Sequence, residues 1–197
     1  MKNNLTFYSE NISSLVTQYD SVSFESVHNA WLKYVPTNGM ALDIGAGSGR
    51  DARYLSEKGL KVYAVEPVLN LMQAAKNNSS KHDIAWYQGG LPNLSQVKVL
   101  GIQFDLILLS AVWMHLSFEE RFLSMKTMAS LLNAGGTLVI TLRHGEFSDG
   151  RTAFPISADE VCQLGEQNDL SLLLKTDLSD DQLGRGDVVW QTVVLSK

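Results

Sequence analysis

Short apolar runs alternate with amphipathic stretches along most of this 197-residue chain. Each run is short enough for one buried β-strand, and the runs lie at residues 40–44, 61–65, 84–87, 104–110 and 137–142. Apolar residues at helical spacing follow most of the runs. This β-then-α alternation predicts an α/β fold with a doubly wound, mostly parallel sheet.

The carboxyl-terminal part of the chain changes pattern. Residues 171–178 and 187–195 read as two strands joined by a polar, glycine-containing turn, which indicates an antiparallel hairpin. Two Ser-x-x-Glu sequences, at 117–120 and 157–160, are typical capping boxes and predict that a helix begins at each.

Residues 1–39 precede the first predicted strand. Apolar positions from Ile12 to Tyr19 recur at helical spacing, and a second helix is expected from Phe24 to Tyr34. The polar stretch 19–23 between them reads as a hinge. We therefore expect one domain, residues 40–197, preceded by a helical segment.

The amino-acid composition argues against several classes of protein. The hydrophobic fraction is 45%, and the net charge of −5 does not suit a protein that grips phosphate backbones. One cysteine, Cys162, allows no intrachain disulfide and no cysteine zinc cluster. Neither a signal peptide nor an apolar run approaching the roughly 20 residues of a membrane span is evident. A cytoplasmic location, no membrane association and no bound metal are the expectations.

The first strand carries the strongest chemical motif. It ends in three glycines, Gly45, Gly47 and Gly49, and a helical pattern starts directly afterwards. Glycine permits a sharp turn and close approach of a ligand to the backbone, and the helix amino end offers free N–H groups. This strand, glycine turn and helix predict a ligand-binding βα unit.

Two acidic residues indicate which class of ligand this unit binds. Asp43 lies two residues before the first glycine, and Glu66 ends the second strand, where a carboxylate can reach the two hydroxyls of a ribose. A dinucleotide fingerprint would place its third glycine where Arg50 stands, which weakens the alternative of a nicotinamide-dependent oxidoreductase.

The spacing Asp-x-Gly-x-Gly-x-Gly at 43–49, followed by Glu66, resembles the first motif and adjoining acidic position of the class I S-adenosylmethionine-dependent methyltransferases. The resemblance covers residues 40–197. It implies a Rossmann-like, seven-stranded sheet, S-adenosyl-L-methionine as cofactor, and a segment before the motif that covers the cofactor. Tyr19, Phe24 and His28 are then candidates for that cover, and the alternative is that all three are packing or surface residues of two amphipathic helices.

The resemblance also implies cofactor contacts at defined positions. Asp43 would lie near the methionine amino group, directly or through water, and Glu66 would accept from the ribose hydroxyls. The remaining cofactor-binding candidates are Gly45, Ala46, Gly47, Leu91, Ser110 and Ala111. The usual acidic residue near the adenine is replaced here by Gln88 or Gly89, so main-chain atoms near Leu91 would serve instead.

Substrate-binding and catalytic candidates follow the later strands. His115 is a candidate general base because its pKa is ordinarily near neutrality, although it could be a structural turn residue. Arg143 and His144 follow strand five and could bind a carboxylate or phosphate on the acceptor, with Tyr19 as a further candidate. Solvated loop charges, or an Arg143 tied to Glu146 or Asp149, are the alternative explanations.

Methyl transfer itself needs positioning more than a dedicated catalyst, because the sulfonium already activates the methyl group. The sequence after strand four, Ser110 to Trp113, lacks the paired prolines typical of nucleic-acid base methylation. A small-molecule acceptor is therefore expected, in a monomer or homodimer. A cofactor-binding regulator without turnover, and a protein or nucleic-acid methyltransferase, stay as alternatives.

Overall fold

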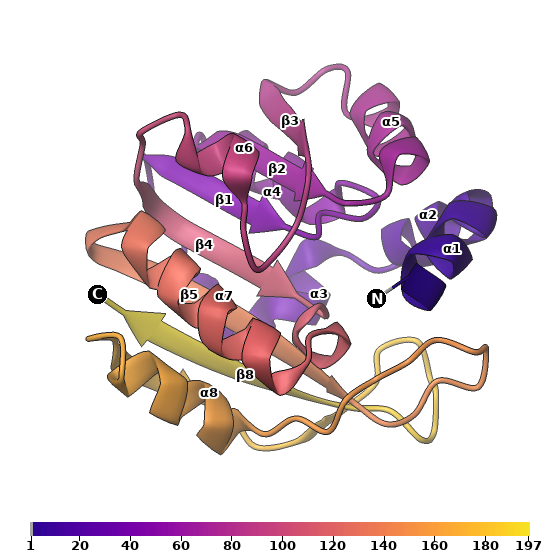
Figure 1. The fold of residues 1–197 in the computed structure, drawn as a ribbon. Helices are drawn as coiled ribbons and strands as arrows, with labels where there is room; N and C mark the ends of the chain where they lie inside the picture. Colours follow the sequence, from indigo (N-terminus) through magenta and orange to yellow (C-terminus); the bar gives the residue numbers. More distant parts are fainter. Residues whose placement is uncertain (1) are drawn as a thin grey trace.

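The computed structural model describes residues 2–197, with side chains from Asn4 onward. One sheet organises the fold, with seven strands in the order β3-β2-β1-β4-β5-β8-β6 and a short β7 paired to β8 (Figure 1). The strands are β1 (Met40–Ile44), β2 (Lys61–Glu66), β3 (Ile84–Gln88), β4 (Phe104–Ser110), β5 (Leu132–His144), β6 (Ser171–Lys175), β7 (Ser179–Asp180) and β8 (Val189–Ser196).

The first five strands are mutually parallel, and β8 runs antiparallel to both β5 and β6. This confirms the α/β class, the mostly parallel sheet and the antiparallel closing strands. The chain winds outward from β1 to β2 and β3, then returns to β4 on the other side of β1. Ligands bind at such a reversal, beyond the carboxyl ends of the strands.

Helices cover both faces of the sheet. The helices are α1 (Lys2–Glu10), α2 (Ile12–Asp20), α3 (Phe24–His28), α4 (Arg50–Glu57), α5 (Leu69–Asn78), α6 (Ser95–Lys98), α7 (Phe118–Leu131) and α8 (Ala158–Glu166), with 3₁₀ turns η1 (Asn29–Tyr34) and η2 (Trp113–His115). One apolar core lies between the sheet and α6, α7 and α8, and a second lies between the sheet, α3, η1 and α4.

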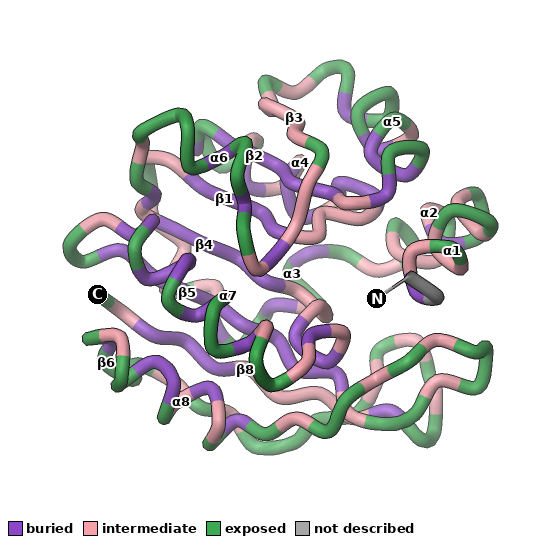
Figure 2. The backbone as a smooth tube through the Cα atoms, viewed as in Figure 1, coloured by how far each residue is buried: buried purple, intermediate pink, exposed green. Residues whose placement is uncertain are grey.

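The central strands are buried on both faces (Figure 2). In β4, the run from Leu106 to Leu109 has no exposed surface, and its residues alternate between the two cores. A parallel strand covered by helices on both sides requires this almost unbroken apolar sequence.

Several elements differ from the sequence-based expectation. The helix expected over 24–34 changes at Asn29 into the 3₁₀ turn η1. Strand β5 begins at Leu132 rather than 137, and β7 adds a short eighth strand to the seven expected. Helix α1 was not predicted. It lies with α2 at the carboxyl edge of the sheet, beside the ends of β1 and β4 (Figure 1).

Candidate functional site

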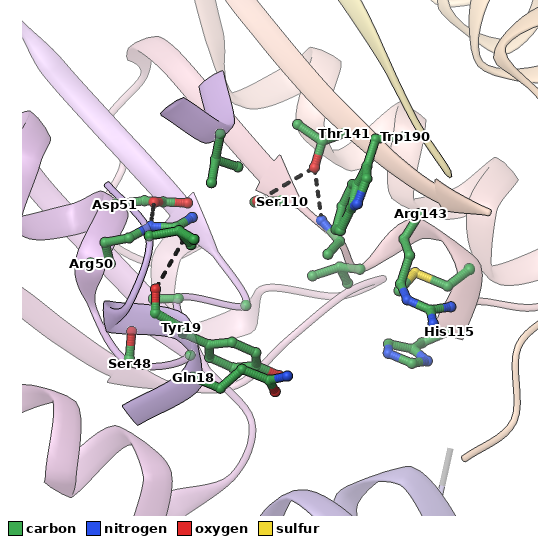
Figure 3. Close-up of a pocket in the computed structure, with 18 of the residues that line it drawn as sticks. Gln18, Tyr19, Ser48, Arg50, Asp51, Ser110, His115, Thr141, Arg143 and Trp190 are labelled. Atoms are coloured by element: carbon green, nitrogen blue, oxygen red, sulfur yellow. Dashed lines mark hydrogen bonds and ion pairs between the residues drawn. The ribbon is translucent and has the colours of Figure 1, made fainter. Parts of the chain in front are cut away.

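A cavity of about 520 Å³ opens at the carboxyl edge of the sheet, between the strand ends and the amino-terminal helices (Figure 3). This volume suits a small-molecule site. Ten of the twelve site residues named from the sequence line it: Tyr19, Gly45, Ala46, Gly47, Glu66, Leu91, Ser110, Ala111, His115 and Arg143. Asp43 and His144 do not.

The glycine loop forms one wall of the cavity, and at Gly45 the backbone leaves no room for a side chain. Gly45 has a φ of +74°, and a Cβ atom built on it would lie 2.5 Å from Cγ2 of Val112. The amides of Gly45 and Ala46 both donate to the carbonyl of Val65, at 2.8 and 3.0 Å. The loop is therefore held tightly against β2, with the start of α4 beside the cavity.

Glu66 is anchored at the end of β2 by two backbone amides. Its Oε2 accepts from the Gly47 amide and its Oε1 from the Val68 amide, both at 3.0 Å. Burial raises the pKa of Glu66 to about 7, and these hydrogen bonds offset only part of the effect. Each oxygen keeps one further acceptor position, so the side chain can still receive two hydroxyl groups from the cavity.

Asp43 does not line the cavity, so of the two contacts expected with the methionine amino group only the one through water fits its position, and that contact stays a prediction. Its side chain is buried behind the cavity wall, and Oδ2 has no partner among the described protein groups. Burial and the negative charge of Asp51 raise the pKa of Asp43 well above its usual range. Direct contact with a ligand is therefore not available to Asp43 in this conformation, whereas Asp51 and Arg50 do line the cavity.

The end of β4 presents a strained residue to the cavity. Ala111 has a φ of +55°, a conformation that costs energy in residues with a Cβ. Its amide donates to both the carbonyl and the Oγ1 atom of Thr141, and Thr141 donates to Ser110 across the strands. Strain held by such surrounding contacts is typical of functional sites.

An apolar wall suits a flat ring. Pro67, Val68, Leu71 and Leu91 line the cavity together with Gly90, on the side of Glu66. Gln88, which stands near the position of the usual acidic residue, does not line it.

Arg143 and His144 point away from each other. Consecutive residues of a strand face opposite sides of a sheet, and β5 continues through both of them. Arg143 faces the cavity with Thr141, whereas His144 lies on the side of Leu142 and the α7–α8 core. The expectation that both contact a substrate fails for His144, because the strand is longer than the apolar run suggested.

His115 lies in the cavity wall with both ring nitrogens engaged. Nδ1 lies 2.9 Å from Nδ2 of Asn4 and 3.3 Å from the Thr152 carbonyl, while Nε2 lies 3.0 Å from the Tyr8 hydroxyl. The Asn4 amide is oriented by Thr152, whose N–H donates to Oδ1 at 2.7 Å. Its Nδ2 group is therefore the donor to Nδ1, which leaves the proton of His115 on Nε2.

The charge state of His115 follows from its surroundings. Burial, with Arg151 and Arg143 nearby, lowers the pKa of His115 to about 4, and the hydrogen bond that a protonated Nδ1 would donate to the Thr152 carbonyl acts in the opposite direction. The imidazole is neutral at neutral pH and has no open acceptor atom toward the cavity. The proton-transfer role suggested by the sequence stays a prediction that this arrangement does not favour.

The amino-terminal segment attaches to the glycine loop. Asp20, at the end of α2, accepts from the Ser48 hydroxyl at 2.6 Å and from Arg53 at 2.9 Å. Arg50 donates to the carbonyl of Tyr19 at 3.3 Å, as Figure 3 shows. Tyr19 thereby reaches the cavity.

The other two residues suggested as part of the cover lie inside the protein. Phe24 and His28 are buried in an aromatic cluster with Trp31 and Tyr54. For these two, packing was the better of the two interpretations that the sequence allowed.

Sequence reasoning missed several residues of the wall. Asn4 and Tyr8 belong to α1, and Phe147 and Arg151 belong to the loop after β5. Trp190 is the second residue of β8. The segment between β6 and β8, which includes β7, adds a further group: Thr176, Asp177, Ser179, Asp180, Asp181, Gln182, Leu183 and Arg185. None lies in a motif, but the strand-end position of Trp190 opposite Arg143 could have indicated it.

Across residues 2–197, no group of three or more His, Cys, Asp and Glu side chains is arranged to hold a metal ion. No helix within that range is long and apolar enough to cross a membrane.

Known proteins share this fold and sequence pattern. Residues 42–140 match the methyltransferase domain family. A protein of Alkaliphilus oremlandii (strain OhILAs), named an uncharacterized methyltransferase, is 29% identical over 102 residues, which cover 52% of this chain and 44% of that protein. The match therefore spans less than half the length of that relative.

Two solved structures illustrate the likeness in fold. TehB from Haemophilus influenzae has a TM-score of 0.69 and 20% identity, with 87% of this chain and 61% of that chain covered. Magnesium protoporphyrin IX methyltransferase from Synechocystis PCC 6803, crystallised with bound S-adenosylmethionine, has a TM-score of 0.64 and 14% identity, with 100% and 82% covered. The family match spans half of the sequence and includes the glycine loop and Glu66, so this chain belongs to the methyltransferase domain family of class I S-adenosylmethionine-dependent methyltransferases.

Proposed function

We propose that the protein transfers the methyl group of S-adenosylmethionine to a small-molecule acceptor held in the same cavity. One observation carries the proposal: a single cavity is lined at one end by the glycine loop and Glu66, and at the other by Arg143 and His115. A cofactor and an acceptor can therefore meet without leaving the protein.

The cofactor end has the groups that this molecule requires. Glu66 offers two acceptor positions for ribose hydroxyls, the glycine loop offers backbone contacts, and Val68, Leu71 and Leu91 offer an apolar wall for the adenine. Arg50 and Asp51 lie where the methionine carboxylate and amino group would extend. Bound there, the cofactor supplies an activated methyl group.

Residues 2–34, called here the N-terminal lid, support a small acceptor. Helices α1 and α2 contribute Asn4, Leu5, Tyr8, Gln18 and Tyr19 to the cavity wall. The lid narrows access to the cavity, which favours an acceptor small enough to fit inside over a folded protein or duplex nucleic acid.

Positioning, rather than proton removal by His115, drives transfer in this proposal. His115 holds Tyr8 and Asn4 of the lid in place through hydrogen bonds at 3.0 and 2.9 Å. Ala111 and Ser110 define the end of β4, beside the position of the transferable methyl group. A reaction that needs only alignment can gain much of its rate from such placement.

Calorimetry and product formation test the proposal. S-Adenosylhomocysteine is expected to bind and NAD is not. Formation of S-adenosylhomocysteine from the methyl donor, with a panel of carboxylate, amine, thiol and phenol acceptors, tests turnover. Cofactor binding without product on any of them, or on a metabolite extract, would favour a binding protein instead. Transfer to a protein or RNA fraction alone would contradict the small-molecule assignment.

A further inference from the structure

We propose that the acceptor is a small anion whose carboxylate or phosphate oxygens bind Arg143. This inference rests on the proposed function, since it names the substrate class of the same cavity. Arg143 sits at the end of β5, two residues beyond Thr141 on the same face of the sheet.

The charges around the cavity single out this arginine. Four arginines line the wall, and three have a carboxylate partner: Arg50 pairs with Asp51, Arg151 with Asp149, and Arg185 with Asp181. Within residues 2–197, Arg143 forms no ion pair. A cation removed from water without a counter-ion is costly, so the protein is more stable once an anion binds there.

The local contacts hold the guanidinium without neutralising it. Nη1 donates to the Gly145 carbonyl at 2.7 Å, Nη2 to the Glu146 carbonyl at 3.3 Å, and Nε has no partner among the described groups. The side chain is 6% exposed. Its hydrogen bonds go to neutral carbonyl oxygens, so no carboxylate contacts it directly.

The ring of Phe147 brings a second cation close. The guanidinium carbons of Arg143 and Arg151 both lie 4.0 Å from the centre of this ring. Burial, with Arg185 and Arg151 nearby, lowers the pKa of Arg143, and the more distant Asp181 offsets only part of this effect; the guanidinium nevertheless stays protonated. Two guanidinium groups beside the Phe147 ring favour the binding of an anionic ligand.

The position of Arg143 suits an acceptor rather than the cofactor. Figure 3 shows Arg143 beside His115 and away from Arg50 and Asp51, with Ser110 and Thr141 between the two groups. Residues two apart on a strand are separated by about 6.6 Å. An oxyanion on Arg143 therefore leaves the body of a small acceptor to extend toward the end of β4.

The carboxylates of the wall do not provide an equivalent site for a cationic acceptor. Asp51 and Asp181 are paired with arginines, and Glu66 accepts from two backbone amides at the cofactor end. The remaining two, Asp177 in the loop after β6 and Asp180 in the short strand β7, are exposed.

Binding of simple probes to the full chain, saturated with S-adenosylhomocysteine, tests the inference. We would titrate benzoate, inorganic phosphate and neutral benzamide at constant ionic strength into the wild type, Arg143→Gln, Arg143→Lys and Lys175→Gln. The last variant removes a cation outside the cavity, where Lys175 pairs with Asp159. Benzoate and phosphate distinguish the two oxyanion classes.

The expected result is anion binding in the wild type and in Lys175→Gln, with at least about a tenfold loss in Arg143→Gln, since a bidentate charged contact is removed. Arg143→Lys is expected to fall between them. Benzamide should bind at least about tenfold more weakly than benzoate. If Arg143→Gln does not fold, at least a threefold loss in Arg143→Lys is the required result.

Several outcomes overturn the inference. The inference fails if the wild type binds no anion, or if the Arg143 variants bind anions as tightly as the wild type does. It also fails if benzamide binds the wild type as tightly as benzoate does. Failure of the proposed function has a different signature, because S-adenosylhomocysteine would then fail to bind the wild type. The anion titration would in that case be read on the ligand-free chain.

Discussion

Nε2 of His28 lies 3.0 Å from Oδ2 of Asp51, and His28 has no exposed surface. Trp31 donates its indole N–H to Nδ1 of the same ring at 3.0 Å, so the proton of His28 must lie on Nε2. Asp51 in turn accepts from Arg50 at 2.6 Å. A buried chain of four side chains thus holds Arg50 and Asp51 at the cavity wall.

Replacing His28 should destabilise the protein. His28→Ala leaves the Trp31 donor unpaired and Asp51 with one partner fewer, at about 1–3 kcal/mol for each buried group. A fall in melting temperature of roughly 4–24 °C is expected for a chain of this size. His82→Ala, which removes a partly exposed histidine paired with an exposed glutamate, is the control and should lower the melting temperature much less. Equal shifts would contradict the argument.

Glu66 should make cofactor affinity depend on pH. Its pKa of about 7 lies above the ordinary 4.5, so between these values the folded chain binds more protons than the unfolded chain. The stability of the ligand-free protein should therefore fall as pH rises through this window. Affinity for S-adenosylhomocysteine should change in the opposite sense, because ribose hydroxyls donate best to the ionised form.

Calorimetry between pH 6 and 8 measures the effect. Affinity should increase by up to about tenfold across this range, as a single group titrates near 7. Glu66→Gln should abolish the pH dependence, and Glu66→Ala should lower affinity at least about tenfold, since hydrogen bonds to a charged group are lost. A variant with unchanged affinity would place the ribose elsewhere.

Much of this arrangement could be read from periodicity, and the exceptions have physical causes. The run 104–110 gave β4 its observed bounds, because a strand buried on both faces needs an apolar residue at nearly every position. The glycine loop and Glu66 lie together because parallel strands end at one edge. Strand β4, the glycine loop and the position of Glu66 could be predicted because each depends on residues close together in the sequence.

Contacts between distant segments could not be read in the same way. Helix α1 has few apolar residues at helical spacing, and Asn4 and Tyr8 are fixed by partners more than 100 positions away. His144 was misplaced because the apolar pattern ends at Leu142, whereas pairing with Val189 continues β5 through His144. Pairing across a sheet depends on the partner strand as well as on the residues themselves.

Gly45→Ala should disrupt the cofactor site. The new methyl group would lie 2.5 Å from Cγ2 of the stiff Val112 side chain, in addition to the cost of a positive φ. Affinity for S-adenosylhomocysteine should fall at least about tenfold. Gly101→Ala is the matched control: its φ is +64° with no atom within 4 Å of the added group, so stability drops by about 1–2 kcal/mol without loss of affinity.

Val112→Ala provides a further check on the cause. If the clash is responsible, the double variant Gly45→Ala/Val112→Ala should regain part of the lost affinity. No recovery would mean that backbone strain, and not the contact with Val112, accounts for the loss.

His115 should matter more for the shape of the site than for proton transfer. His115→Gln keeps a donor and an acceptor, so turnover on an identified acceptor should fall less than about threefold, whereas loss of a general base costs about 10²-fold or more. His144→Gln, outside the cavity, should turn over normally. A loss near 10²-fold in His115→Gln alone would restore the general-base assignment.

The pKa of His115 gives an independent measurement. Its value of about 4 in the folded chain lies below the ordinary 6.5, so the unfolded chain binds more protons between these values. Stability should therefore decline as pH falls from 6.5 toward 4, and His115→Gln should decline less steeply over the same range. Urea unfolding at a series of pH values would show parallel curves if His115 did not contribute.

Asn4 should control the docking of helix α1. Its side-chain amide accepts from the Thr152 N–H at 2.7 Å, donates to the Thr152 carbonyl at 2.9 Å, and donates to His115. Asn4→Ala removes all three contacts at one point of the N-terminal lid, while the sheet and both cores stay intact. Hydrogen exchange of the α1 amides should accelerate by about tenfold or more, with little change in the strands.

Ser9→Ala is the matched control, because Ser9 is exposed on the same helix and the substitution has little effect on helix propensity. If the three contacts of Asn4 hold the lid closed, only Asn4→Ala should also speed the exchange of bound S-adenosylhomocysteine, since the ligand leaves when α1 opens. Equal protection of α1 in both variants would mean that Tyr8 and the apolar contacts suffice to keep the helix docked. Faster exchange throughout the sheet would instead indicate global destabilisation, and the control of docking could not then be assigned to Asn4.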